Sequence, residues 1–152
     1  MASAVSLLDS DTKIKVSSTL DRSVGKKHLT DRSPETCWTS AQGLPQYIQL
    51  SFPNPVTPTS VTITFQGGFV GTRCCIYHLP STASDERSVS PEWVPIGHIF
   101  PEDVNRSQRF TLSSISEGSA SVRTSSLKLV FEESSDFFGR VTIYNFDVEG
   151  SP

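Results

Sequence analysis

Four side chains of the types that bind zinc lie in the middle of the chain, at Cys74, Cys75, His78 and His98. Structural zinc sites usually contain two cysteines separated by two residues, a spacing that this sequence lacks. Adjacent side chains on a β-strand point to opposite faces, so the neighbouring cysteines would not share a metal. The pattern favours buried cysteines and a surface histidine over a zinc site.

The acidic residues Glu132, Glu133 and Asp136 are a second group with possible chemistry. Two carboxylates can carry out acid–base catalysis, but such residues at the end of a strand are more often solvated. The sequence also lacks the nucleophile-elbow, His-Glu-x-x-His, Walker and dinucleotide-binding motifs. We therefore expect no enzymatic activity.

Basic residues are concentrated between Gly25 and Arg32, a stretch that contains Lys26, Lys27 and His28. The whole chain has 13 Lys and Arg against 16 Asp and Glu, a formal net charge of -3. Nucleic-acid binders usually carry a basic excess that neutralises phosphates, so we expect no direct binding of nucleic acid. The stretch is typical of a solvated loop, and a patch for phosphate or an acidic partner is the alternative.

The chain has 152 residues, and we expect a single domain over residues 1–152. No apolar run approaches the roughly 20 residues that span a bilayer, and the first residues do not resemble a signal peptide. Three cysteines, two of them adjacent, do not form a disulfide framework. These features predict a soluble protein of the nucleus or cytoplasm that does not bind membranes.

Composition and periodicity both indicate β-strands. Val, Ile and Thr number 13, 8 and 14, against only 5 Ala, and β-branched residues favour a pleated sheet. Apolar and polar residues alternate through 48–52 and 61–65, with a proline-rich turn expected between them. Short strands without a sustained helical period predict an all-β fold, an antiparallel β-sandwich or jelly roll, with further strands at 73–79, 92–99, 108–112, 126–132 and 140–148.

The alternation also predicts the core. With Trp38 at its edge, the core is expected to contain Ile48, Leu50, Phe52, Val61, Ile63, Phe65, Leu127, Leu129, Phe131, Val141 and Ile143. Within the last strand the apolar residues change parity, which either a β-bulge near Tyr144 and Asn145 or burial on both faces explains. Polar loops are expected at Pro80–Pro91 and Ser113–Ser125.

Residues 29–40, with Asp31, Thr36 and Trp38, resemble the entry loop of the discoidin or galactose-binding-like superfamily. Together with residues 25–29, 65–69 and 136–141 and the end of the last strand, they make the chain similar to the nuclear receptor 2C2-associated protein family. The resemblance covers most of the chain at both ends, and little of it lies in residues 73–107.

The superfamily resemblance implies one structural calcium ion. In many members the entry loop surrounds calcium, and Asp31 and Thr36 stand where the loop ligands stand. A glutamate near the end of the last strand closes the site in those relatives, and the matching position here is Asn145, which lacks charge. The alternative is that Asp31 caps its own turn by accepting backbone hydrogen bonds.

The family resemblance implies a protein-interaction domain that binds an orphan nuclear receptor or another intracellular protein and represses transcription. Sandwiches of this superfamily usually bind through loops at one end. Here the loops 66–71 and 136–140 carry Phe69, Phe137 or Phe138, and Arg140, residue types that anchor interfaces. At least one of Phe137 and Phe138 is expected to be a core plug instead.

Two other functions are compatible with the same fold. The first is a structural subunit of a larger intracellular assembly, as in the Doc and intraflagellar-transport members of the superfamily. The second is a carbohydrate-binding module, but no aromatic platform with converging polar groups is evident in the sequence, and a glycan ligand is not expected. Fold alone does not separate these functions, because function resides in sites placed on the fold.

Overall fold

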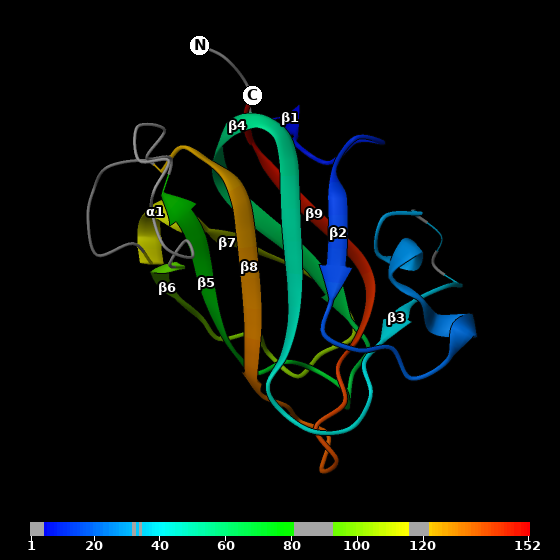
Figure 1. Ribbon diagram of the computed structural model, residues 1–152. Coiled ribbons are helices and arrows are strands. Elements are labelled where there is room, and N and C mark those ends of the chain that lie inside the picture. Colours follow the sequence, from blue (N-terminus) through cyan, green and yellow to red (C-terminus); the bar gives the residue numbers. More distant parts are fainter. Residues whose placement is uncertain (1–4, 32, 34, 81–92, 116–121) are drawn as a thin grey trace.

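The structure is a computed structural model that describes residues 5–31, 33, 35–80, 93–115 and 122–152 (Figure 1). The predicted loop at 80–91, apart from Pro80, lies outside these residues. So do Glu92, where a strand was expected to begin, and the segment 116–121 of the predicted serine-rich loop. No helix in the described part of the chain is long and apolar enough to cross a membrane.

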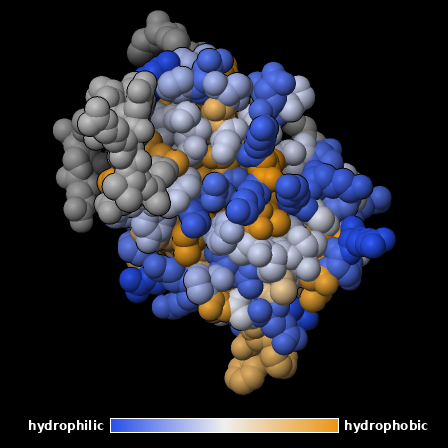
Figure 2. All heavy atoms as spheres, viewed as in Figure 1, coloured by the Kyte–Doolittle hydropathy of each residue, from blue (hydrophilic) through white to orange (hydrophobic). Residues whose placement is uncertain are grey.

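Two antiparallel β-sheets pack into a sandwich, which confirms the predicted fold. In the first sheet the strand order is β2 (Lys13–Val16), the first half of β4 (Gln46–Phe65), β8 (Thr124–Glu133), β5 (Arg73–Pro80) and β6 (Val94–Ile99). The second sheet contains β1 (Val5–Ser6), β3 (Trp38–Thr39), β9 (Thr142–Ser151), the second half of β4 and β7 (Ser107–Thr111). Figure 2 shows that mostly polar side chains cover the outer surface on the side of the first sheet.

In the described residues, helical structure is limited to three short segments between the strands. They are η1 (Arg22–Val24), η2 (Lys26–Leu29) and α1 (Leu112–Ile115). Leu29 at the end of η2 is fully buried, so η2 packs onto the sandwich and carries the lysine-rich segment on its exposed side. Helix α1 begins at Leu112, where the sequence predicted the end of a strand.

The proline-rich turn predicted between residues 52 and 61 does not separate two strands, because β4 is one strand of 20 residues. Its first half pairs with β2 and β8, and its second half pairs with β7 and β9. The pairing register shifts between Ser51 and Val56, across Pro53 and Pro55, which have no N–H group to donate. The strand therefore arches from one sheet into the other and reverses its direction there, as Figure 1 shows, so the reversal expected of the predicted turn is present.

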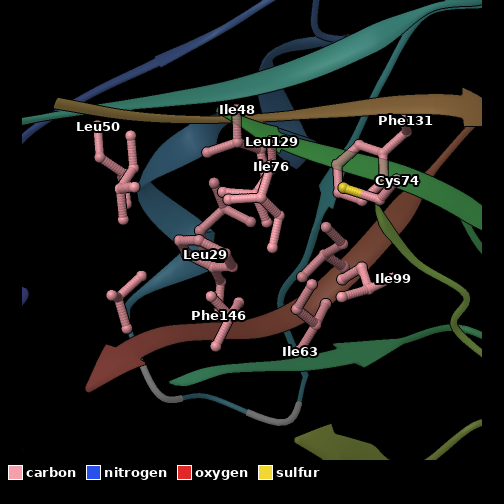
Figure 3. Packing of buried hydrophobic residues seen from close by; sticks show 14 of the residues in the cluster. Leu29, Ile48, Leu50, Ile63, Cys74, Ile76, Ile99, Leu129, Phe131 and Phe146 are labelled. Atoms are coloured by element: carbon pink, nitrogen blue, oxygen red, sulfur yellow. The ribbon is translucent and has the colours of Figure 1, made fainter. Parts of the chain in front are cut away.

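The core lies between the sheets and contains every side chain predicted for it. Phe65 and Phe131 meet edge to face with ring centroids 5.9 Å apart. Figure 3 shows side chains from β4, β5, β8 and β9 converging with Leu29 in this cluster. Trp38 is fully buried, and its Nε1 donates to the Ser18 carbonyl at 3.1 Å.

A register shift in β9 confirms the predicted bulge. Thr64 pairs with Asn145 and Phe65 pairs with Ile143, so Tyr144 is the extra residue. Polar or half-exposed side chains then alternate with buried Phe146 and Val148, which excludes burial on both faces for this strand. The bulge accounts for the parity change seen in the sequence.

Candidate partner-binding site

Two loops meet at one end of the sandwich. The first connects β4 to β5 and includes Phe69, and the second connects β8 to β9 and includes Arg140. The Val70 amide donates to Ser135 Oγ, and the Ser135 amide donates to the Val70 carbonyl, both at 2.9 Å. The amide of Thr142 donates to the Phe69 carbonyl at 3.0 Å. These bonds hold together two segments that lie about half the chain apart in sequence.

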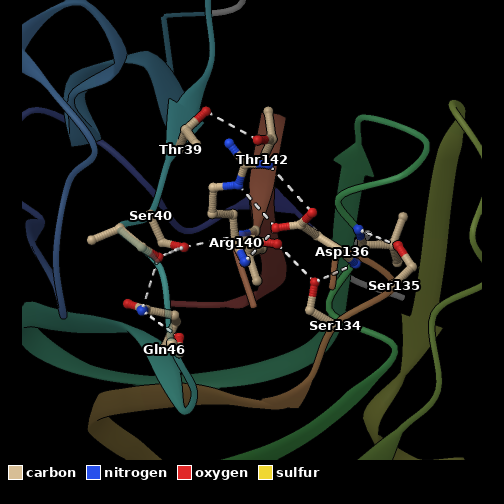
Figure 4. Close-up of polar contacts among 12 residues, drawn as sticks. Thr39, Ser40, Gln46, Ser134, Ser135, Asp136, Arg140 and Thr142 are labelled. Atoms are coloured by element: carbon tan, nitrogen blue, oxygen red, sulfur yellow. Dashed lines mark hydrogen bonds and ion pairs between the residues drawn. The ribbon is translucent and has the colours of Figure 1, made fainter. Parts of the chain in front are cut away.

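Asp136 and Gly139 shape the second loop into a tight turn. The Gly139 amide donates to the Asp136 carbonyl at 3.0 Å, and Gly139 has a φ of 79°, a conformation that favours glycine. Asp136 Oδ2 accepts from the Arg140 amide at 3.0 Å and from Arg140 Nε at 2.9 Å, as Figure 4 shows. The hydrogen bonds from Arg140 lower the pKa of the Asp136 carboxyl group.

The guanidinium of Arg140 lies close to two aromatic rings. Its central carbon is 5.0 Å from the centre of the Phe69 ring and 5.6 Å from that of Phe138. Both distances are within the range of a cation–π interaction. Phe137 then meets Phe138 edge to face, with ring centroids 5.3 Å apart. The structure thus brings the three predicted partner-binding residues, Phe69, Phe137 and Arg140, into one cluster.

The prediction that one of Phe137 and Phe138 plugs the core is wrong. Phe137 is 94% exposed and Phe138 is 52% exposed. The turn carries both rings out beyond the ends of β8 and β9, while the neighbouring Val70 and Val141 are the residues that join the core. Figure 2 shows the resulting apolar tip, at the end where the β8–β9 loop projects in Figure 1.

Sequence analysis missed Leu44 as a member of this site and gave Phe138 only as the alternative to Phe137. Leu44 is 42% exposed, and Gly43 beside it donates its amide to the Phe138 carbonyl at 2.8 Å. A shallow groove of about 420 Å³ lies here, lined by Gly43, Leu44, Glu133, Ser134, Asp136, Phe137, Phe138 and Gly139. The position of Leu44 between a glycine and a proline was a signal that this apolar residue lies in an exposed turn. No feature of the neighbouring sequence indicated that it lies near residue 138.

Asp31 and Thr36, the predicted calcium ligands of the entry loop, contact each other. Asp31 Oδ2 accepts from Thr36 Oγ1 at 2.6 Å and lies 2.8 Å from His28 Nδ1. Asp31 Oδ1 accepts from the Ser33 amide at 3.0 Å, which is the turn cap considered as the alternative. The hydrogen bond from Thr36, followed by those from His28 and Ser33, lowers the pKa of Asp31 to about 2.

Asn145, the third predicted calcium ligand, lies on β9. With Thr30 and Ser33 it lines a groove of about 1020 Å³ between the β9 bulge and the segment before β2. Its side chain makes no hydrogen bond to Asp31 or Thr36. Among the three predicted ligands, the only carboxylate is that of Asp31, and both of its oxygens already accept hydrogen bonds. Calcium takes six to eight oxygen ligands, so these residues are a poor fit to it. Calcium binding at this loop stays a prediction.

Asp31→Asn should lower the melting temperature at pH 6, because the folded state favours the ionised carboxylate. The folded pKa of about 2 lies below the ordinary 3.8, so this stabilisation is present above pH 4 and is lost as the pH falls towards 2. Thermal unfolding of wild type and variant from pH 6 to 2 should show the difference shrinking. Asp11→Asn, at an exposed aspartate, is the matched control and should change little at either pH.

The same two proteins test calcium. The superfamily resemblance predicts a higher melting temperature in millimolar calcium than in chelator for wild type, and no difference for Asp31→Asn. The hydrogen bonds around Asp31 predict equal melting temperatures for wild type in both solutions. Equal values would remove the metal from this loop.

The cysteines and histidines considered for zinc are not arranged around a common point. Cys74 and Cys75 are both buried free thiols, and burial raises the pKa of each. His98 Nε2 lies 3.1 Å from Glu132 Oε1, and Arg73 Nε donates to the same oxygen at 2.9 Å. In the part of the chain that the structure describes, no three His, Cys, Asp or Glu residues are placed to hold a metal ion.

Comparison of the sequence with known proteins establishes the family. Nuclear receptor 2C2-associated proteins from Danio rerio, Mus musculus and Homo sapiens are 39%, 40% and 37% identical to the chain. The alignments cover 97%, 95% and 95% of this chain and 96%, 95% and 96% of those proteins. The chain belongs to the nuclear receptor 2C2-associated protein family. No protein-family model matches it.

Solved structures show that this chain has a discoidin-like fold. The F5/8 type C domain of a Bacteroides fragilis protein superposes with a TM-score of 0.74 at 14% identity, covering 98% of this chain and 96% of that domain. The family 32 carbohydrate-binding module of C. perfringens NanJ, solved with galactose, gives 0.73 at 14% identity and covers 96% of this chain and 98% of the module. At this identity the likeness concerns the fold alone.

Proposed function

We propose that this chain is a non-enzymatic interaction domain that binds a nuclear receptor of the orphan class through the end loops. The names of the relatives, which associate them with nuclear receptor 2C2, support this class of partner. The observation that carries the proposal is the cluster of Phe137, Phe138, Leu44, Phe69 and Arg140, which gathers exposed apolar groups around one cation.

The cluster has the composition of an interface centre. Aromatic residues and arginine dominate the binding energy of protein interfaces, and they act best where the partner excludes water. Exposed apolar surface contributes roughly 25 cal/mol per Å² when it is removed from water, and Phe137 alone is 94% exposed. Binding by this site therefore rests mainly on burial of the two phenylalanine rings.

The same cluster is held in place before a partner arrives. Asp136 accepts two hydrogen bonds from the guanidinium of Arg140, from Nε at 2.9 Å and from Nη2 at 3.4 Å, and the ring of Phe138 lies against that guanidinium. Side chains that are already ordered lose less conformational entropy on binding, which raises affinity without additional contacts. Repression, in this proposal, results from occupancy of a receptor surface in the nucleus or cytoplasm.

Phe69→Ala and Arg140→Ala should each weaken capture of the receptor more than they lower the melting temperature. Phe69 is half-buried and supports Arg140, so its loss leaves the core intact but frees the guanidinium. The experiment is affinity purification of the tagged chain from cells that express the receptor, together with thermal unfolding of each purified variant. Phe100→Ala is the matched control, because Phe100 is 65% exposed and outside the cluster.

Equal losses of folding and capture would show that Phe69 and Arg140 are structural residues and would contradict the proposal. A stable complex of fixed composition without a receptor would support the alternative of a structural subunit. A receptor-driven reporter then tests repression: wild type should lower its output, and the two variants should lower it less.

A further inference from the structure

The outer face of the first sheet carries an ordered row of side chains that the end loops do not use. The pairing register places Lys15 opposite Gln49, Gln49 opposite Lys128, and Lys128 opposite Tyr77. Their neighbours Ile14, Leu50 and Leu127 point into the core or pack against it, so these polar residues share the outward face. Directly opposed residues lie about 5 Å apart on a sheet, so the row crosses β2, β4, β8 and β5 without a gap.

Three lysines give this face a positive charge, although the chain as a whole has a net charge of -3. Lys13 and Lys15 are exposed on β2, and Lys128 lies on β8. Among the described residues, no carboxylate lies within 4 Å of these three ammonium groups. Glu132, the acidic residue of β8 on this face, is engaged by Arg73 and His98.

Aromatic rings hold the central lysine. Lys128 Nζ lies 4.4 Å from the centre of the Tyr47 ring and 5.6 Å from that of the Trp93 ring. Tyr47 and Trp93 are both half-buried, so their rings flank the cation with apolar surface. A cation fixed between aromatic rings suits a partner that brings a carboxylate and apolar groups to the same place.

We propose that the outer face of the first sheet, defined by Lys13, Lys15, Tyr47, Gln49 and Lys128, is a second docking surface for an extended acidic segment of a protein partner. An extended chain presents every second side chain to one face, so several carboxylates of one such segment can contact this face at once. Nucleic acid fits less well, because three lysines on an acidic protein release few counterions. This surface is separate from the end loops and does not depend on receptor binding there.

The probe is a synthetic peptide of alternating Glu and Val, titrated into the isotope-labelled full chain while backbone amide shifts are followed by NMR. Shifts should concentrate on β2, the first half of β4, β8 and β5, and the affinity should fall as salt is added. The same peptide with Gln in place of Glu, and a single-stranded oligonucleotide of equal charge, are the comparison ligands. Both should bind more weakly than the acidic peptide.

Lys15→Glu/Lys128→Glu should reduce the affinity for the acidic peptide by about tenfold or more, since both changes place a like charge on the surface. Lys26→Glu/Lys27→Glu makes the same change in net charge on η2 and should reduce it less than twofold. Lys15→Gln/Lys128→Gln, which removes charge without reversing it, should give an intermediate loss and covers the case in which the first variant fails to fold.

Three results would overturn the proposal. They are equal losses in the two charge-reversed variants, shifts concentrated in the loops 66–72 and 134–141, and tighter binding of the oligonucleotide than of the peptide. The first result would mean that net charge alone attracts the peptide. The other two would assign the peptide to the end loops or the face to nucleic acid.

Discussion

Trp38→Ala should lower the free energy of unfolding by about 3–5 kcal/mol, the range measured when large aromatic side chains are removed from cores. The indole is fully buried under the entry loop and contributes a hydrogen bond from Nε1 to the Ser18 carbonyl. Its removal leaves a cavity and an unpaired carbonyl at the same place. Because domains of this size are stable by only about 5–15 kcal/mol, the variant should be close to unfolding at body temperature.

Chemical denaturation monitored by far-ultraviolet circular dichroism measures this loss. Trp93→Ala is the matched control, because Trp93 is half-exposed on the outer face of the first sheet and contributes no core contact. Trp93→Ala should lower the free energy of unfolding much less than Trp38→Ala does. Similar losses for both tryptophans would contradict the assignment of Trp38 as the residue that closes the core beneath the entry loop.

The core was predictable from sequence because strand parity is a local property. Ile48, Leu50 and Phe52 alternate with polar residues, and a single buried face imposes that period on any strand of a sandwich. The bulge at Tyr144 was predictable for the same reason, since it interrupts the alternation. The passage of β4 from one sheet to the other was not, because prolines at 53 and 55 are compatible both with a hairpin within one sheet and with an arch between two sheets.

The site was only partly predictable. Phe69 and Arg140 were identified as interface residue types, but their contact depends on backbone hydrogen bonds between two distant loops. The exposure of Phe138 depends on the turn that Asp136 and Gly139 form, which a hydrophobic pattern does not encode. Asp31 and Thr36 contact each other because Thr36 follows Asp31 by only five positions, whereas Asn145 lies on β9 and makes no hydrogen bond to either.

Phe137→Ala/Phe138→Ala should reduce receptor affinity by at least a hundredfold while the melting temperature stays within a few degrees of wild type. Removal of an interface hot spot costs about 2 kcal/mol or more, and each 1.4 kcal/mol corresponds to a tenfold change in affinity. Both rings lie outside the core, so their loss removes no buried packing. Surface substitutions of this kind usually change stability by about 0.5 kcal/mol or less.

The most direct test of receptor binding through the end loops is calorimetric titration of the purified receptor with wild type and with Phe137→Ala/Phe138→Ala. Lys26→Glu/Lys27→Glu, on η2, serves as the control surface variant. Wild type and the control should bind with equal affinity, and the phenylalanine variant should bind at least a hundredfold more weakly while it remains folded. Equal affinity of all three proteins, or no binding by wild type, would contradict the assignment of this surface to the receptor.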